Sequence, residues 1–139
     1  MKVVFDTNIY IDFLRSGLFS ELLYENKTLK YMSPTVLSEL WAGAKNNPSE
    51  RTLSQLQKPY QIHHRIIDQT PNMSIALGQF LCDIPNSNKD LIRKASFLND
   101  IRIALETSSI GAVLYTNNKS DFQMIKNRMK KLAVEFIGQ

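Results

Sequence analysis

The sequence contains a single cysteine, Cys82, and no long apolar run, and each absence excludes a class of protein. One cysteine cannot form an internal disulfide or hold a metal ion by itself. The longest apolar stretch covers residues 110–115, whereas a membrane-spanning helix needs about 20 residues. Only three apolar residues stand between Lys2 and Asp6, which argues against a secretory signal peptide. We therefore expect no membrane association, a reducing cytoplasmic setting, and a buried core thiol at Cys82.

The chain also lacks a strong excess of one charge, since 17 basic and 13 acidic residues give a formal net charge of +4. This balance alone does not indicate a nucleic-acid ligand. The distribution is more informative, because five basic residues and only one acid, Asp121, fall between Lys119 and Lys131. A solvated helix face and a patch that attracts phosphate groups are both compatible with this cluster.

Short β-branched and aromatic runs alternate with helical patterns along the 139 residues, a length that suits one domain spanning residues 1–139. This alternation predicts an α/β fold, a three-layer α/β/α sandwich around a mostly parallel sheet. No internal repeat or low-complexity linker interrupts the pattern. We expect five strands, at Lys2–Phe5, Leu29–Met32, Gln61–Ile66, Ala112–Thr116 and Ala133–Ile137.

Helix starts are marked by local capping signals. Ser33-Pro34 and Thr70-Pro71 each place a capping hydroxyl before a proline at the first helical position, ahead of an apolar stripe. A further helix is expected to open near Asn99-Asp100, and Ser120 is the expected N-cap of the last helix.

Four acids fall where the ends of these elements are expected to meet. Asp6 follows the first strand, and Asp121 comes five residues after the fourth. The carboxyl ends of parallel strands share one edge of a sheet, where ligands bind. Glu39 projects away from the apolar stripe of its helix, and Asp100 opens the helix before the fourth strand. The sequence therefore permits one carboxylate cluster at this edge.

Such a cluster needs a counter-charge, because carboxylates held close together repel one another and would otherwise take up protons. Mg²⁺ prefers oxygen ligands and can activate water for phosphodiester hydrolysis without a histidine or cysteine. Each acid also has a structural alternative. Asp6 could cap the turn after the first strand, and Glu39 could be a solvated helix residue. Asp100 and Asp121 could simply stabilise helix starts through the macrodipole.

Two motifs in this order along the chain are specific enough to suggest a protein family. Asp-Thr-Asn at residues 6–8 ends an apolar strand, and Thr-x-Asn-x-x-Asp-Phe occupies residues 116–122. With the weaker segments 33–40 and 99–100, they resemble the PIN-domain family, and most of all the VapC-type toxins of toxin–antitoxin pairs. The resemblance covers nearly the whole chain.

This resemblance implies a ribonuclease that uses Mg²⁺ or Mn²⁺. It implies supporting roles for the Thr116 hydroxyl and the Asn8 amide, an RNA substrate such as a tRNA or rRNA loop, a homodimer, and a small antitoxin protein that enters the acidic groove. The residues that it implies as metal ligands, directly or through water, are Asp6, Glu39, Asp100 and Asp121.

The sequence departs from the family after its third acid, where residues 101–106 replace an alanine-rich helix. Glu106 in this segment could be a further ligand, although a surface position is the better expectation. Lys45 and Lys119 are candidate phosphate contacts. His63 and His64 are expected to flank a strand, and Trp41 is expected to pack in the core or at a dimer interface.

Two other functions stay open at this point. One is a housekeeping RNA-processing nuclease with the same site, and the other is a degenerate PIN-like module that binds RNA or protein without cleaving it.

Overall fold

The structure is a computed structural model, and it describes residues 1–85, 87, 90 and 94–138 of the chain. Its described strands form one parallel sheet in the order β2-β1-β3-β4. All three neighbouring pairs are parallel, which confirms the predicted sheet type. The strands are β1 (Lys2–Phe5), β2 (Leu29–Tyr31), β3 (Val113–Thr116) and β4 (Ala133–Phe136).

The centre of the sheet is apolar because helices cover both of its faces. Val3, Val4 and Phe5 of β1 are almost completely buried, as is Leu114 of β3. Strands buried on both faces have continuous hydrophobic runs instead of alternation, and the sequence of β1 has this pattern. β1 and β3 are therefore rigid central strands, and the residues that follow them are held in fixed places.

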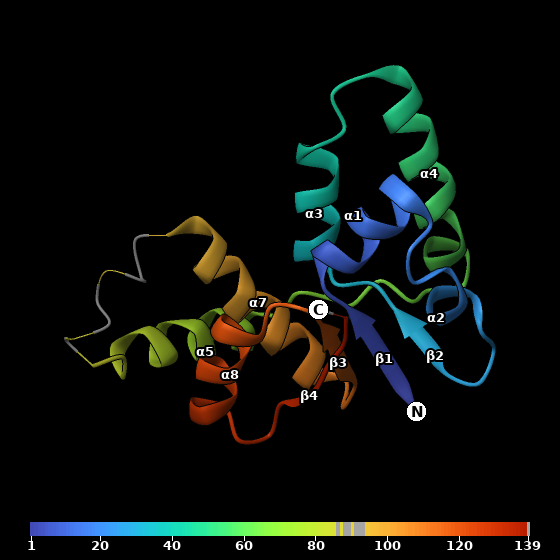
Figure 1. The fold of residues 1–139 in the computed structure, drawn as a ribbon. Helices are drawn as coiled ribbons and strands as arrows, with labels where there is room; N and C mark the ends of the chain where they lie inside the picture. The colour runs from blue at the N-terminus through green and yellow to red at the C-terminus, as the bar shows by residue number, and fades with distance from the viewer. Residues whose placement is uncertain (86, 88–89, 91–93, 139) are drawn as a thin grey trace.

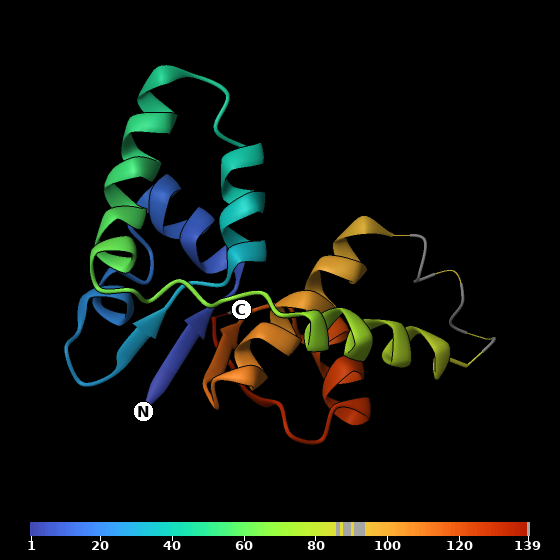
Figure 2. The same ribbon diagram turned by 180° about the vertical axis from the view of Figure 1, so that it is seen from behind.

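Helices on two sides of the sheet complete three layers, which confirms the predicted α/β/α class (Figures 1 and 2). The first four helices gather on one side, and the last three described helices gather on the other. The helices are α1 (Thr7–Ser16), α2 (Ser20–Tyr24), α3 (Pro34–Ala42), α4 (Asn47–Ile62), α5 (Pro71–Cys82), α7 (Ala95–Ser109) and α8 (Lys119–Arg128).

The predicted helix starts are partly confirmed. Ser33 caps α3 as predicted, since its hydroxyl accepts a hydrogen bond from the Val36 amide at 3.0 Å. α5 begins at Pro71 as predicted, although the Thr70 side chain makes no capping bond. Two boundaries were wrong by a few residues, because such boundaries depend on tertiary contacts. α7 begins earlier than predicted, at Ala95, and the N-cap of α8 is Asn118 instead of Ser120.

The predicted third strand at residues 61–66 was wrong, so the described sheet has four strands instead of five. α4 continues to Ile62, and His63 and His64 form the turn after it. Only Ile66 reaches the sheet, through a single parallel bridge to Met32. The last turn of α4 is held by Tyr60, which packs against the core with its hydroxyl 2.8 Å from that of Tyr10.

The prediction of a buried thiol at Cys82 was wrong, because this residue is exposed at the end of α5. Trp41 packs against the core, and its indole N–H donates to Gln57 Oε1 at 2.6 Å. Within the described part of the chain, no helix has the length and apolar character needed to cross a membrane.

Candidate active site

Asp6 stands where β1 ends, and three contacts fix it. Its Oδ1 accepts a hydrogen bond from the Thr7 amide at 2.8 Å, so that Asp6 is the N-cap of α1. Its Oδ2 accepts from the Thr116 hydroxyl at 2.7 Å, and its backbone amide donates to the Tyr115 carbonyl at 2.9 Å. Asp6 is only 3% exposed. The capping role that the sequence left open is therefore real, and it coexists with a place at the sheet edge.

Glu39 reaches the same edge from α3. Its Oε1 accepts a hydrogen bond from the Thr7 hydroxyl at 2.6 Å, and its Oε2 accepts from the Asn99 amide at 3.4 Å. Thr7 is the neighbour of Asp6, and Asn99 is the neighbour of Asp100. Glu39 is partly exposed, so that one side of the carboxylate faces solvent.

Asp100 and Asp121 share one donor, the side-chain amide of Asn118. The Asn118 nitrogen lies 3.3 Å from Asp100 Oδ2 and 3.3 Å from Asp121 Oδ2. Asp100 is buried on α7, whereas Asp121 is partly exposed in the first turn of α8. Asn118 also donates its backbone amide to the Thr116 hydroxyl at 3.0 Å, which connects this pair to Asp6.

The charges of the four acids act on one another. Burial raises the pKa of Asp6, and hydrogen bonds from Thr116 and the Thr7 amide oppose that rise. The charges of Glu39 and Asp121 raise the pKa of Asp6 further. The structure thus gathers Asp6, Glu39 and Asp121 within electrostatic range, which their sequence positions alone could not require.

Asp100 is strongly perturbed by burial and by its acidic neighbours. Burial is the largest cause, followed by the charges of Asp6 and Asp121, a hydrogen bond with Asp121 and the charge of Glu39. Together they raise the pKa of Asp100 to about 8. A buried acid surrounded by like charges marks a place where a cation is favoured.

The donor set can be compared with the needs of a metal ion. No group of three His, Cys, Asp or Glu side chains in the described ranges is arranged to hold a metal by itself. Mg²⁺ usually binds proteins through one or two carboxylates and keeps several of its waters. Asp100 and Asp121, which share the Asn118 amide, supply the two carboxylates that a hydrated Mg²⁺ or Mn²⁺ would need, and the charges of Asp6 and Glu39 also act at Asp100. Zn²⁺ favours nitrogen and sulfur ligands, which this edge does not offer among the described residues.

The other predicted site residues differ in where they lie. Thr116 is completely buried, and its hydroxyl donates to Asp6. Asn8 is exposed in the first turn of α1. Lys119 is exposed at the start of α8, and Lys45 is exposed after α3. Neither lysine makes a hydrogen bond or ion pair with the four acids in the described structure.

Three residues that sequence reasoning did not place in the site hold its acids. Thr7 and Asn99 hold Glu39, and Asn118 joins Asp100 to Asp121. Each of these three adjoins or belongs to a predicted motif, which is the signal that could have found them. Glu106 corrects the expectation of a surface acid, because it is 2% exposed and hydrogen-bonded inside the protein.

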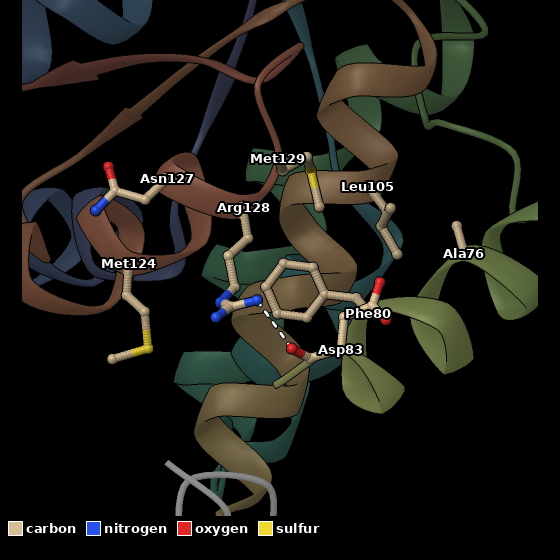
Figure 3. A pocket seen from close by; sticks show the side chains of 8 residues that line it. All are labelled: Ala76, Phe80, Asp83, Leu105, Met124, Asn127, Arg128 and Met129. Carbon is tan, nitrogen blue, oxygen red and sulfur yellow. Dashed lines mark hydrogen bonds between the residues drawn. The ribbon is translucent and has the colours of Figure 1, made fainter. Parts of the chain in front are cut away.

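The cavities of the surface do not by themselves point to the acids. A cavity of about 690 Å³ lies between α5, α7 and α8, with none of the four acids in its wall (Figure 3). There the Arg128 guanidinium donates to the Asp83 backbone carbonyl at 2.9 Å, beside Phe80 (Figure 3). A second groove, of about 450 Å³ between α1, α3 and α4, has Glu39 in its wall. The chemistry of the side chains, not cavity size, therefore identifies the candidate site.

No protein-family model matches the sequence, and no curated protein matches it. Solved structures are similar over nearly the full length. VapBC-1 from nontypeable Haemophilus influenzae has 25% identity and a TM-score of 0.69, with 98% of each chain covered. VapBC2 from Rickettsia felis, bound to a promoter DNA fragment, has 25% identity and a TM-score of 0.69, with 99% of this chain and 100% of that chain covered.

A third structure, DNA-bound VapBC from Salmonella typhimurium, shares the fold with 22% identity and a TM-score of 0.70, and 98% of each chain is covered. These similarities confirm the resemblance to VapC-type PIN-domain proteins that the motifs predicted.

Proposed function

Because this chain resembles VapC-type PIN-domain proteins in motifs and in fold, we propose that it is a metal-dependent endoribonuclease and the toxin of a toxin–antitoxin pair. The observation that carries the proposal is the cluster of Asp6, Glu39, Asp100 and Asp121, in which the charges of the neighbouring acids help to raise the pKa values of Asp6 and Asp100. Charged carboxylates held close together destabilise the folded protein, and a bound cation relieves this repulsion.

The side chains divide the work of binding. Asp100 and Asp121 are held as a pair by Asn118 and are proposed as direct metal ligands. Asp6 is fixed by Thr116, and Glu39 by Thr7, so that both carboxylates present oriented acceptors to bound water. When bound, Mg²⁺ or Mn²⁺ supplies an activated water for attack on phosphorus and neutralises charge on the leaving oxygen.

The residues that remain for the substrate are exposed and polar. Lys119 lies at the start of α8, close in sequence to Asp121, and is proposed to attract a phosphate of the RNA. Lys45 is proposed as a second, more distant phosphate contact. The two histidines are exposed in the turn after α4, so the proposed reaction does not depend on a histidine base.

The groove beside Glu39 supports the proposed antitoxin partner. Its floor is largely apolar, and Leu14 on its rim is 38% exposed. A partner segment with apolar side chains in this groove could place an arginine or lysine against Glu39 and compensate the acidic cluster. The solved relatives are VapBC structures, which supports such a partner. We also propose a homodimer, which sedimentation analysis of the purified protein would test.

The test is incubation of the purified protein with total RNA in Mg²⁺, in Mn²⁺ and in EDTA, followed by mapping of the cut ends. We expect cleavage with either metal and none in EDTA. Asp6→Asn should reduce the cleavage rate by about 100-fold or more, since it removes a negative charge that is proposed to orient water on the metal. Asp68→Asn makes the same chemical change at an exposed acid and should leave the rate unchanged.

Cleavage that continues in excess EDTA, or in Asp6→Asn, would contradict the proposed mechanism. The toxin role has a separate test, because growth arrest on expression should be relieved by the product of a small neighbouring reading frame. Cleavage without growth arrest would favour a housekeeping nuclease.

A further inference from the structure

Glu106 is a buried acid on α7 with hydrogen-bond donors on both carboxylate oxygens. Its Oε1 accepts from the Ser33 hydroxyl at 2.5 Å and from the Thr35 amide at 3.4 Å. Its Oε2 accepts from the Thr35 hydroxyl at 2.7 Å and from Gln69 Nε2 at 3.1 Å. A carboxylate satisfied in this way is not poised to bind a metal, and its donors indicate what it does instead.

Three of these four donors belong to the first residues of α3. Ser33 is the N-cap of α3, and its hydroxyl also accepts from the Val36 amide. Thr35 is completely inside the protein at the second helical position. A negative charge at a helix N-terminus is favoured by the macrodipole. Glu106 therefore fastens the start of α3 to α7.

α3 and α7 each carry one of the proposed site acids. Glu39 follows Thr35 by four residues, which is about one helical turn, so both side chains share a face of α3. Asp100 precedes Glu106 by six residues on α7, a rise of about 9 Å. The two helices are therefore joined twice along one interface, by Glu106 at the start of α3 and by Asn99 at Glu39.

We propose that Glu106 is a positioning residue, which sets the Glu39 carboxylate against Asp100 by holding the first turn of α3 to α7. This inference rests on the proposed function, because it requires the metal site proposed there. Glu106 itself stays outside the metal's ligand set. Its loss removes three hydrogen bonds between α7 and the start of α3, so that Glu39 is held by Thr7 and Asn99 on a helix that is no longer fixed at its first turn.

The experiment measures Mn²⁺ affinity by calorimetry in EDTA-treated and dialysed protein, without RNA. Four proteins form a cycle: the unmodified protein, Glu106→Gln, Glu39→Gln and the double variant. Glu39→Gln keeps the other three acids and so still binds Mn²⁺, more weakly. We expect Glu106→Gln to weaken binding by about 10-fold, the usual scale for residues behind metal ligands. In the Glu39→Gln background the same change should have less than about a 2-fold effect, because the residue that it positions is gone.

Glu25→Gln is the matched control. Glu25 also accepts hydrogen bonds from a neighbouring threonine hydroxyl and a backbone amide, and it forms an ion pair with Lys30, but it precedes the amino end of β2, whereas the four acids lie toward the carboxyl ends of the strands. A residue with only a structural role lowers stability without changing Mn²⁺ affinity, so Glu25→Gln should leave affinity unchanged. Equal weakening by Glu106→Gln in both backgrounds, or no weakening, would overturn the inference.

Thr35→Val keeps the inference testable if Glu106→Gln does not fold, since it removes one of the same hydrogen bonds from the α3 side. It should show the same dependence on Glu39, and the same two outcomes would overturn the inference. The proposed function fails in a different way. If the unmodified protein binds no Mn²⁺, both the proposed function and this inference are wrong. If it binds Mn²⁺ but does not cut RNA, only the proposed function is wrong, and the affinity measurements still test the inference.

Discussion

Replacing Asp100 by asparagine should make the metal-free protein more stable, although it removes a residue of the proposed site. The pKa of Asp100 is raised from 3.8 to about 8 in the folded protein, chiefly by burial and then by the charges of Asp6 and Asp121. Folding therefore disfavours the ionised form of this side chain. Asparagine has nearly the same shape, carries no charge, and can still accept the hydrogen bond that Asn118 donates.

The expected gain depends on pH in a defined direction. Below about pH 4 the carboxyl is protonated in both folded and unfolded chains, so the variant should have no advantage. Between about pH 4 and pH 8 the unfolded chain gives up this proton and the folded chain retains it, so the stability of the unmodified protein falls as pH rises. At 1.36 kcal/mol per pKa unit the full shift has a ceiling of about 6 kcal/mol.

We expect a measured gain of about 1–3 kcal/mol near pH 8, because water at the open side of the cluster screens these charges. The assay is urea unfolding in EDTA at several pH values, with Asp68→Asn as the control at an exposed acid. Excess Mg²⁺ should remove the advantage, because the bound ion stabilises only the protein that keeps the Asp100 carboxylate. An advantage that is equal at acid and alkaline pH, or a variant less stable in EDTA near pH 8, would refute the electrostatic reasoning.

The remaining predictions concern the core and the RNA. Tyr10→Phe should lower the free energy of unfolding by about 1–2 kcal/mol, because it leaves the largely buried Tyr60 hydroxyl without its 2.8 Å partner. Urea unfolding measures this, and an unchanged midpoint would show that the pair contributes nothing. Lys119→Ala should weaken RNA binding similarly for different sequences and lower the salt dependence of binding by about one ion, as loss of a phosphate contact does. The control is Lys27→Ala, at an exposed lysine before β2, and an unchanged salt slope in Lys119→Ala would remove the proposed phosphate contact.

Local patterns predicted the parts of this fold that local chemistry determines. The apolar runs of β1, β3 and β4 and the Ser33-Pro34 start of α3 were found because each pattern matches a single type of structure. The strand predicted at residues 61–66 was wrong because a short run with isoleucines is compatible with both a strand and a helix end. Only the packing of α4 against the core decides between them.

The sequence predicted the four acids of the candidate site but missed the residues that hydrogen-bond to them or to their helices. Asp6 and Asp121 stand in motifs whose spacing is visible in the sequence, whereas the bond from Asn118 to Asp100 on α7 depends on three-dimensional packing. Glu106 was misjudged for a related reason. Its donors lie more than 30 residues away in the chain, at Ser33, Thr35 and Gln69, and periodicity on one helix does not reveal a distant hydroxyl.

The central position of β1 has a consequence for how the protein is made. β1 is translated before its partner strand, because the register partner Val113 and the Thr116 hydroxyl that holds Asp6 follow it by about 110 residues. An incomplete nascent chain has only Asp6 and Glu39 and lacks the strand that anchors them, since such non-local pairing forms late. The complete set of four acids therefore exists only in chains that have been translated through Asp121 of α8, and Asp6 is held at the sheet edge only after β3 has paired with β1.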